Sequence, residues 1–178
     1  MRRNRAIIIA VLLTLIDQLV KLFIKLFHIN TEFNIIGDYI RFRPHLNTDY
    51  SWINSLGNFG IGLGIHIALV LIIIGVSVVI YGFITTRCKD DKLIEFSFGC
   101  LFGGAISSLI DKIFWDGSLD FISLEQLFIF DLKDVYISTF QFLIIYMLLV
   151  NYRGFADLKE KQIINEFRDY ITSVIIRT

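Results

Sequence analysis

The apolar positions of this chain gather in four long runs separated by shorter polar stretches. A helix needs about 20 mostly apolar residues to cross the roughly 30 Å of hydrocarbon in a bilayer. The run over 61–84 is the clearest and carries no acidic residue. The pattern predicts an all-α membrane protein with four transmembrane helices, at approximately 6–27, 61–84, 93–115 and 135–152.

The polar stretches predict a small amount of sheet and one further helix. Apolar and basic residues alternate over Tyr39–Arg43, which is typical of a short strand with one face on apolar surroundings. We expect a small extracytoplasmic β platform there and an outer loop over 116–134. Near-helical spacing of apolar residues in the tail 153–178 predicts an amphipathic helix. That helix would either lie on the inner membrane surface or pack beneath the bundle.

Lysine and arginine residues orient the chain, because cytoplasmic loops carry an excess of them. Both termini are therefore expected in the cytoplasm, with the loops over 28–60 and 116–134 outside it. The basic start is not interpreted as a cleaved signal peptide, because the run after it is long, contains Asp17, Lys21 and Lys25, and lacks a small-residue cleavage site. The orienting cations are Arg2, Arg3, Arg5, Arg87, Lys89, Lys92, Arg153, Lys159 and Lys161.

The composition agrees with a membrane protein and narrows the classes of partner. Hydrophobic residues make up 55% of the 178 positions, more than in ordinary soluble domains, and charged residues only 19%. A formal net charge of +0 gives no support for a nucleic-acid partner. The length fits a single membrane domain over 1–178. Cys88 and Cys100 show neither a disulfide framework nor metal-ligand spacing, so we expect free thiols.

Charged residues inside the apolar runs are the first candidates for function, because ionisable groups at bilayer depth are costly and usually face a protein interior or an aqueous cavity. Asp17 and Lys21 share a helix face at i, i+4 spacing and can neutralise each other. They form either an internal ion pair or part of a site. Asp111 and Lys112 follow small residues, over 103–108, that predict a close helix contact. These two could also be a helix end whose charges reach the interface.

Two aspartates of the outer loop could act as a catalytic pair. Taken alone, Asp120 could be an ordinary surface carboxylate, because it follows the turn-like sequence Asp116-Gly117-Ser118. Asp131 and Asp134 could be the N-cap and third residue of the fourth helix. If the loop folds back over the bundle, Asp120 and Asp134 meet. Two close carboxylates in a poorly hydrated site do not both ionise, so one keeps its proton while the other activates a shared water.

Taken together, these motifs resemble the lipoprotein signal peptidase family, signal peptidase II. The resemblance spans most of the chain and includes the spacing of the middle acids, 120 − 111 = 9 residues. It implies a four-helix bacterial membrane aspartic protease with Asp120 and Asp134 as the catalytic pair. The matching segments are Ile16–Lys21, Asn47-Thr48, Gly103–Ala105, Leu109–Lys112, Leu119–Phe121 and Phe130–Asp134. The supporting positions implied are Asp17, Asn47, Ser108, Asp111, Lys112 and Asp131.

The resemblance also implies a substrate and a location. The substrate would be a prolipoprotein whose lipobox cysteine already bears a diacylglyceryl group, cleaved immediately before that cysteine. The site would lie at the outer surface of the bacterial cytoplasmic membrane, among membrane lipids, and we expect a monomer. No metal or cofactor is expected, and the histidines are too dispersed for metal-ligand spacing. These are His28, His45 and His66.

Several departures from the family pattern mark a divergent member. Ser108 stands in place of Asn and Lys112 in place of Arg, which loses a planar bidentate fork. Asp131 replaces Asn and adds a like charge beside the pair, which Lys133, in place of a small residue, can offset. Residues 49–52 read Asp-Tyr-Ser-Trp where the family has small residues ending in Phe.

The leading hypothesis is therefore an aspartic endopeptidase that releases signal peptides from lipidated prolipoproteins. One alternative is a divergent homologue that binds lipoproteins without cutting them, or that has another lipid-linked substrate. A second is a small ion or proton transporter with Asp17, Lys21 and Asp111 as a relay. The acids gather near one predicted membrane surface, which argues against a continuous path across the bilayer.

Overall fold

The protein is described by a computed structural model over residues 5–50, 54, 57, 59–125, 127–154 and 160–176. The prediction of four membrane-length helices is confirmed within this part of the chain. They are α1 (Arg5–Phe27), α3 (Leu63–Arg87), α4 (Lys92–Phe114) and α5 (Leu132–Leu149). Some residues used in the sequence interpretation lie outside the described ones, namely Arg2, Arg3, Ser51, Trp52 and Lys159.

Aspartate caps set where two of these helices begin. Asp91 accepts hydrogen bonds from the backbone N–H groups of Leu93 and Ile94 at the start of α4. Asp131 caps α5, which therefore begins at Leu132 rather than at the predicted 135. The helix ends at Leu149 rather than at the predicted 152. A side-chain oxygen at the N-cap satisfies backbone donors that the helix itself cannot. The predicted N-cap role of Asp131 is confirmed.

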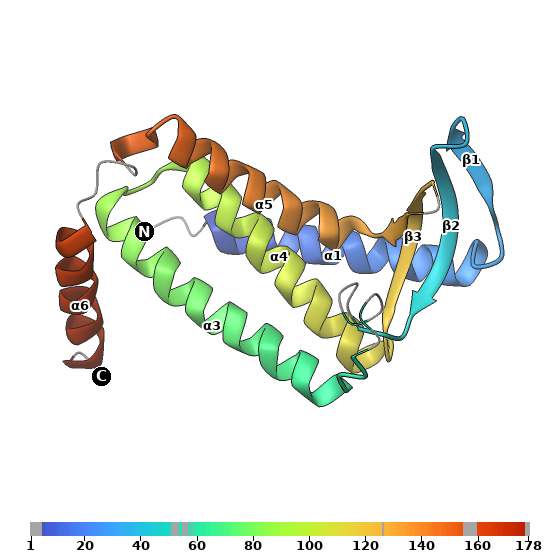
Figure 1. Ribbon diagram of the computed structural model, residues 1–178, viewed down its shortest axis with the longest axis horizontal. Helices are drawn as coiled ribbons and strands as arrows, with labels where there is room; N and C mark the ends of the chain where they lie inside the picture. The colour runs from blue at the N-terminus through green and yellow to red at the C-terminus, as the bar shows by residue number, and fades with distance from the viewer. Residues whose placement is uncertain are drawn as a thin grey trace.

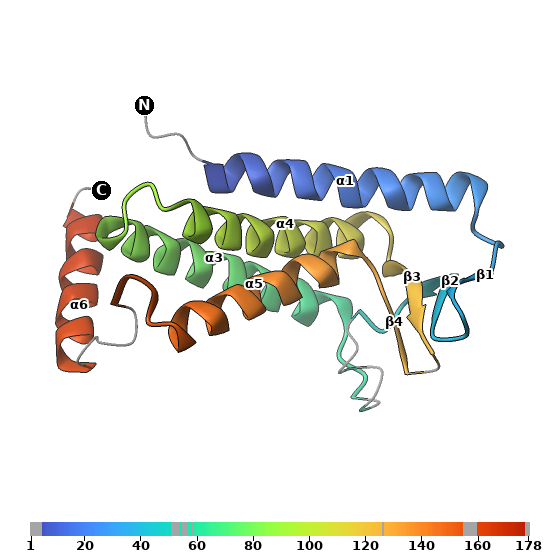
Figure 2. The same ribbon diagram turned by 90° about the horizontal axis from the view of Figure 1, so that it is seen from above.

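Helix α4 lies at the centre of the bundle and contacts α1, α3 and α5 (Figures 1 and 2). Glycines permit the close approach: a Cβ on Gly104 would lie 2.7 Å from Cγ1 of Ile137 on α5. On the side facing α1, a Cβ on Gly99 would lie 2.7 Å from the Cβ of Ile9. The helix contact predicted from the small residues over 103–108 therefore forms, and Gly99 extends it in a Gly-x-x-x-Gly arrangement that the sequence interpretation missed.

A four-stranded antiparallel sheet lies across one end of the bundle (Figure 1). The strand predicted over Tyr39–Arg43 is confirmed as part of β2. The outer connection predicted over 116–134 contains two strands that were not predicted, one of which pairs with β2, distant in sequence. In sheet order the strands are β1 (Phe33–Ile36), β2 (Ile40–Asn47), β3 (Ser118–Leu124) and β4 (Phe128–Phe130).

The opposite end of the bundle carries α6 (Glu160–Ile176), which runs across the direction of the other helices (Figures 1 and 2). The Phe83 ring of α3 packs against the rings of Phe167 and Tyr170. Arg87 Nε lies 3.2 Å from an Oε atom of Glu166. Of the two interpretations of the tail, packing beneath the bundle is the one that these contacts support.

Candidate active site

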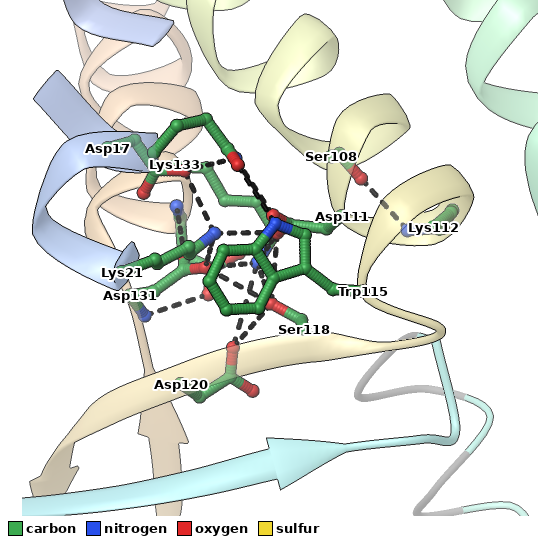
Figure 3. A network of polar contacts seen from close by, with 12 residues as sticks. Asp17, Lys21, Ser108, Asp111, Lys112, Trp115, Ser118, Asp120, Asp131 and Lys133 are labelled. Atoms are coloured by element: carbon green, nitrogen blue, oxygen red, sulfur yellow. Dashed lines mark hydrogen bonds and ion pairs between the residues drawn. The ribbon is translucent and has the colours of Figure 1, made fainter. Parts of the chain in front are cut away.

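Lys21 joins three helical elements at the sheet end of the bundle. Its ammonium lies 2.9 Å from Asp17 on the same helix, 2.6 Å from Asp111 on α4 and 2.6 Å from Asp131 at the start of α5. All four side chains are fully buried. The predicted i, i+4 pair therefore exists, but it is one edge of a larger network (Figure 3). A charged cluster this deeply buried is stable only because each group has a partner of opposite sign.

A second ammonium, that of Lys133, connects this network to Asp120. Lys133 Nζ bonds Asp131 and the Ser118 hydroxyl, and lies 3.3 Å from Asp111 and 3.6 Å from Asp120. The Ser118 hydroxyl lies within hydrogen-bond distance of all three aspartates and closest to Asp120, at 2.8 Å. A hydroxyl carries one proton, so Ser118 donates to one carboxylate at a time.

The Gln18 side chain links α1 to the end of α4. Gln18 Nε2 donates to Asp111 at 2.9 Å and to Asp17 at 3.2 Å, while Trp115 Nε1 donates to Gln18 Oε1 at 3.1 Å. The indole therefore fixes which way the amide points. In Figure 3 the Trp115 ring lies beside the acid cluster.

The sheet register delivers Asp120 to this cluster. β2 and β3 pair so that Asn47 lies opposite Ser118, and Asn47 Nδ2 donates to Asp120 Oδ2 at 3.2 Å. Asp120 is only 4% exposed, so it is not the ordinary surface carboxylate that its position after a turn suggested. Burial raises the pKa of the Asp120 carboxyl above its ordinary range, and the Lys133 ammonium is the largest influence opposing that rise.

Asp131 and Asp134 form a reciprocal capping box at the start of α5. The Asp131 side chain accepts the N–H of Asp134 at 3.2 Å, and the Asp134 side chain accepts the N–H of Asp131 at 3.2 Å. Burial alone would raise the pKa of Asp131, but Lys133 and Lys21 outweigh it and lower that pKa to about 2. Asp131 is therefore an anion at neutral pH, and its cap holds Asp134 at the edge of the cluster.

The distance between Asp120 and Asp134 is compatible with a shared water. Carboxylate oxygens of Asp120, Asp131 and Asp134 lie within 4.8 Å of one another. Two O–H···O hydrogen bonds of about 2.8 Å each can span up to about 5.6 Å. One water can therefore contact both Asp120 and Asp134 without any movement of the backbone.

Ser108 and Lys112 pair with each other beside the acid cluster. Lys112 Nζ donates to Ser108 Oγ at 2.9 Å, and Figure 3 shows this pair on the side of α4 away from Asp17. Lys112 is 5% exposed and Asp111 is fully buried. The interpretation of Asp111 and Lys112 as a helix end whose charges reach the interface is therefore wrong, because both side chains are buried.

The acids are close enough to be compared with a metal site. In each of two sets of three carboxylates, one oxygen per residue lies within 4.8 Å of the others. Ammonium groups already stand among them: Lys21 contacts the whole first set, and Lys133 contacts Asp120 and Asp131 in the second. These cations neutralise the acids and would repel a divalent ion, so the donor sets do not fit a metal. The first set is Asp17, Asp111 and Asp131, and the second is Asp120, Asp131 and Asp134.

Ser118 is the residue of this site that the sequence interpretation missed, since it was assigned only to a turn. Its position two residues before Asp120 puts both side chains on the same face of β3, because side chains alternate along a strand. The alternation would have pointed to Ser118 had that segment been recognised as a strand. Trp115 carried no comparable signal.

Four membrane-length helices, a small sheet and a buried acid cluster where they meet define a polytopic membrane protein with a polar centre at one end. Comparison with known families identifies its relatives. A sequence model of the family described as Signal peptidase (SPase) II matches residues 9–150. The chain therefore belongs to the signal peptidase II family, a family of proteases. Helix α6 lies beyond the matched residues.

Two solved structures, each described as a bacterial membrane enzyme, share this fold. The first is 23% identical, with a TM-score of 0.65 over 87% of this chain and 92% of the other. The second is also 23% identical, with a TM-score of 0.62 over 84% of this chain and 97% of the other. The arrangement of helices and sheet is thus one already seen in bacterial membranes.

Proposed function

We propose that this protein is an aspartic endopeptidase that removes signal peptides from diacylglyceryl-modified prolipoproteins, cutting before the lipidated cysteine. Membership in the signal peptidase II family supports the class of reaction. The observation that carries the assignment of residues is the proximity of Asp120 and Asp134, whose carboxylate oxygens lie within 4.8 Å. The two acids come from different elements, β3 and α5, that the fold brings to one place.

The proposed chemistry is general acid–base catalysis by this pair. The ionised aspartate removes a proton from the shared water as the water attacks the scissile carbonyl, and the protonated aspartate polarises that carbonyl. The proton taken from the water then passes to the amide nitrogen, which leaves as the amine when the C–N bond breaks. The two buried carboxylates favour sharing one proton, since two adjacent anions away from water repel each other strongly.

The supporting residues hold this pair in place. Asn47 donates to Asp120, and Asp131 caps the helix turn that carries Asp134. Asp17 and Asp111 neutralise Lys21, which in turn contacts Asp131. These contacts fix the geometry before substrate arrives, which is how positioning lowers a reaction barrier.

The membrane setting suits a lipid-modified substrate. Exposed apolar side chains cover the helices, so acyl chains can remain in hydrocarbon beside them while the peptide reaches the acids. The excess of lysine and arginine in the opposite loops supports an outer-surface site with both termini in the cytoplasm of a bacterium. We propose a monomer whose partners are the prolipoprotein and membrane lipids, with no nucleic acid involved.

Two pairs of departures from the family pattern bear on activity. Lys133 bonds Asp131, so the additional anion at 131 has its own counter-ion. Lys112 bonds Ser108, so these two departures also contact each other. The substituted positions therefore pair among themselves, which supports retained activity over a non-cleaving homologue.

The test uses the purified full-length chain with a diacylglyceryl-modified prolipoprotein and its unmodified form. We expect cleavage of the lipidated substrate, and a fall in kcat of at least about 1,000-fold for Asp120→Asn and for Asp134→Asn. Asp90→Asn, an exposed acid between α3 and α4, is the matched control and should cleave normally. Cleavage that survives both catalytic changes contradicts the pair. Binding of substrate without cleavage by the wild type would identify a non-cleaving homologue, and charge-dependent flux in liposomes a transporter.

A further inference from the structure

The Lys133 side chain links the carboxylates that surround Lys21 to Asp120. Lys21 and Lys133 both contact Asp111 and Asp131, and Lys133 also contacts Asp120. The Lys133 side chain is 8% exposed, so water does little to screen its charge. Its ammonium donates to Ser118 Oγ. Of the aspartates around Ser118 Oγ, Asp120 is the nearest.

We propose that Lys133 is a positioning residue that keeps Asp120 ionised, as the base of the pair, by orienting the Ser118 hydroxyl towards it. The anion of Asp131, which is bonded to Lys133, acts against this effect. The proposal rests on the function proposed above, in which Asp120 and Asp134 share a water. It adds a positioning residue and assigns the shared proton: Asp134 holds it and is the acid, and Asp120 is the base.

The hydrogen bonds around the two aspartates differ in the way this assignment needs. Asp120 receives Ser118 Oγ–H on one oxygen and Asn47 Nδ2–H on the other, with the Lys133 ammonium 3.6 Å away. Because Lys133 donates to the Ser118 oxygen, the serine proton is directed away from Lys133 and towards a carboxylate. Asp134 accepts the backbone N–H of Asp131. The Lys133 charge acts on Asp134 as well as on Asp120, so the difference between the two acids lies in their donors. Two side-chain donors favour the charged form of Asp120, whereas Asp134 accepts a backbone N–H, so we assign the charge to Asp120.

The wider charge balance makes the loss of one cation consequential. Four carboxylates, those of Asp17, Asp111, Asp120 and Asp131, contact two ammoniums, so acids already exceed bases. On β2, His45 pairs with Asp120 in the sheet and is exposed. Of the charged groups, Lys133, Asp131 and Asp134 lie nearest to Asp120. The wider cluster adds Asp17 and Lys21 on α1 and Asp111 on α4, with Lys112 beside it.

The decisive experiment measures the protonation of Asp120 directly and separately from catalysis. Infrared difference spectra report the C=O stretch of protonated carboxyl groups, and the band that disappears in Asp120→Asn gives the midpoint for Asp120. We expect Lys133→Met to move this midpoint up by about 1–3 pH units, because an opposite charge at this distance lowers a carboxyl pKa by that amount. Asp131→Asn should move it down. Lys133→Arg should stay near the wild type.

Kinetics with the lipidated substrate give the second readout. In Lys133→Met the acid limb of the kcat profile should shift upward with the infrared midpoint, while KM changes less than about threefold. The double variant Asp131→Asn/Lys133→Met should regain most of the lost kcat, because the opposing anion is gone too. Lys92→Met, an exposed lysine at the other end of α4, is the matched control.

An unchanged midpoint in Lys133→Met overturns the proposal, even if kcat falls, since a purely structural role would lower activity without moving the titration. If that variant does not fold, Asp131→Asn and the double variant decide, and a midpoint that fails to drop in Asp131→Asn overturns it. The proposed function fails separately: a wild type that does not cleave refutes the protease assignment, while the infrared midpoints still report what Lys133 does to Asp120.

Discussion

Lys21 and Asp111 connect α1 and α4 through a 2.6 Å ion pair in which both side chains are completely buried. The pair lies at the sheet end of α1 and α4, and Asp17 and Asp131 also contact the same ammonium. A single lysine therefore joins α1, α4 and the start of α5, the elements that carry Asp134 and most of the supporting residues.

Replacing Lys21 should destabilise the fold more than any surface change. In Lys21→Met three buried carboxylates lose their shared cation, and breaking a buried pair in this way costs about 3–5 kcal/mol of unfolding free energy. Unfolding in detergent or lipid, followed by circular dichroism, measures this. Lys25→Met is the control one turn along α1, where an exposed lysine lies 4.7 Å from the Trp115 ring and contributes about 0.5–1 kcal/mol. Equal losses in the two variants would show that Lys21 does not hold the cluster.

The contact between α4 and α5 should not accept a larger residue at Gly104. A Cβ there would meet Ile137 Cγ1 at 2.7 Å and the backbone oxygen of Lys133 at 3.0 Å. Gly104→Val should cost about 1–3 kcal/mol of stability, because overpacking forces backbone shifts. It should also slow cleavage, since α5 carries Asp134.

Thermal unfolding and initial rates test this prediction. Gly75→Val on α3, where a Cβ would meet nothing within 4 Å, is the matched control. If Gly104→Val and Gly75→Val behave alike, close packing at Gly104 does not position α5.

Asn47 should affect the reaction more than the stability. Its amide donates to Asp120 Oδ2 from the neighbouring strand. In Asn47→Ala we expect kcat to fall about 10-fold to 100-fold with KM nearly constant, because the hydrogen bond orients a reacting group rather than the substrate. Steady-state kinetics on the lipidated substrate measure the split. Asn34→Ala, which removes an exposed amide bonded to Asp38, should leave kcat unchanged. A change confined to KM would instead place Asn47 in substrate binding.

Asp91 predicts how stability at the other end of the bundle depends on pH. Burial would raise its pKa, but hydrogen bonds from the Ile94 and Leu93 N–H groups and the Tyr152 hydroxyl, together with the Arg153 charge, lower it below the ordinary value. A carboxyl group with a lowered folded pKa stabilises the fold above its unfolded pKa, and this contribution is lost as pH falls through the folded pKa.

Asp91→Asn should therefore cost about 1 kcal/mol at neutral pH, since a charged acceptor makes stronger hydrogen bonds than a neutral one. The difference from wild type should shrink below about pH 4, where the wild-type carboxyl becomes protonated. Unfolding free energies measured between pH 7 and pH 3 test this, with the exposed neighbour variant Asp90→Asn as the control. A difference that stays constant with pH would mean that the charge of Asp91 is not what stabilises the cap.

The boundaries of the elements show how far local patterns predict this fold. The four helices follow from the lengths of apolar runs, and β2 follows from the alternation over Tyr39–Arg43. Strand β3 was missed, because its residues become a strand only by pairing with β2, and the membrane-length helices α3 and α4 lie between these strands in the sequence. The start of α5 was set too late, because a capping aspartate extends a helix beyond its apolar run.

The same distinction holds for the site. The apolar runs and the charged residues within and beside them predict that acids and lysines gather near one membrane surface. The motifs indicate Asp120, Asp134 and the family. Tertiary structure alone decided that Lys21 serves Asp111 and Asp131 as well as Asp17, and that Ser118 and Lys133 stand between the acids. The contacts of Lys21 with Asp111 and Asp131 join residues 111 − 21 = 90 and 131 − 21 = 110 positions apart, and that of Ser118 with Lys133 joins residues 15 positions apart. Spacing along the chain fixes which face of a helix or strand a side chain occupies, whereas which faces meet depends on the packing of the whole bundle.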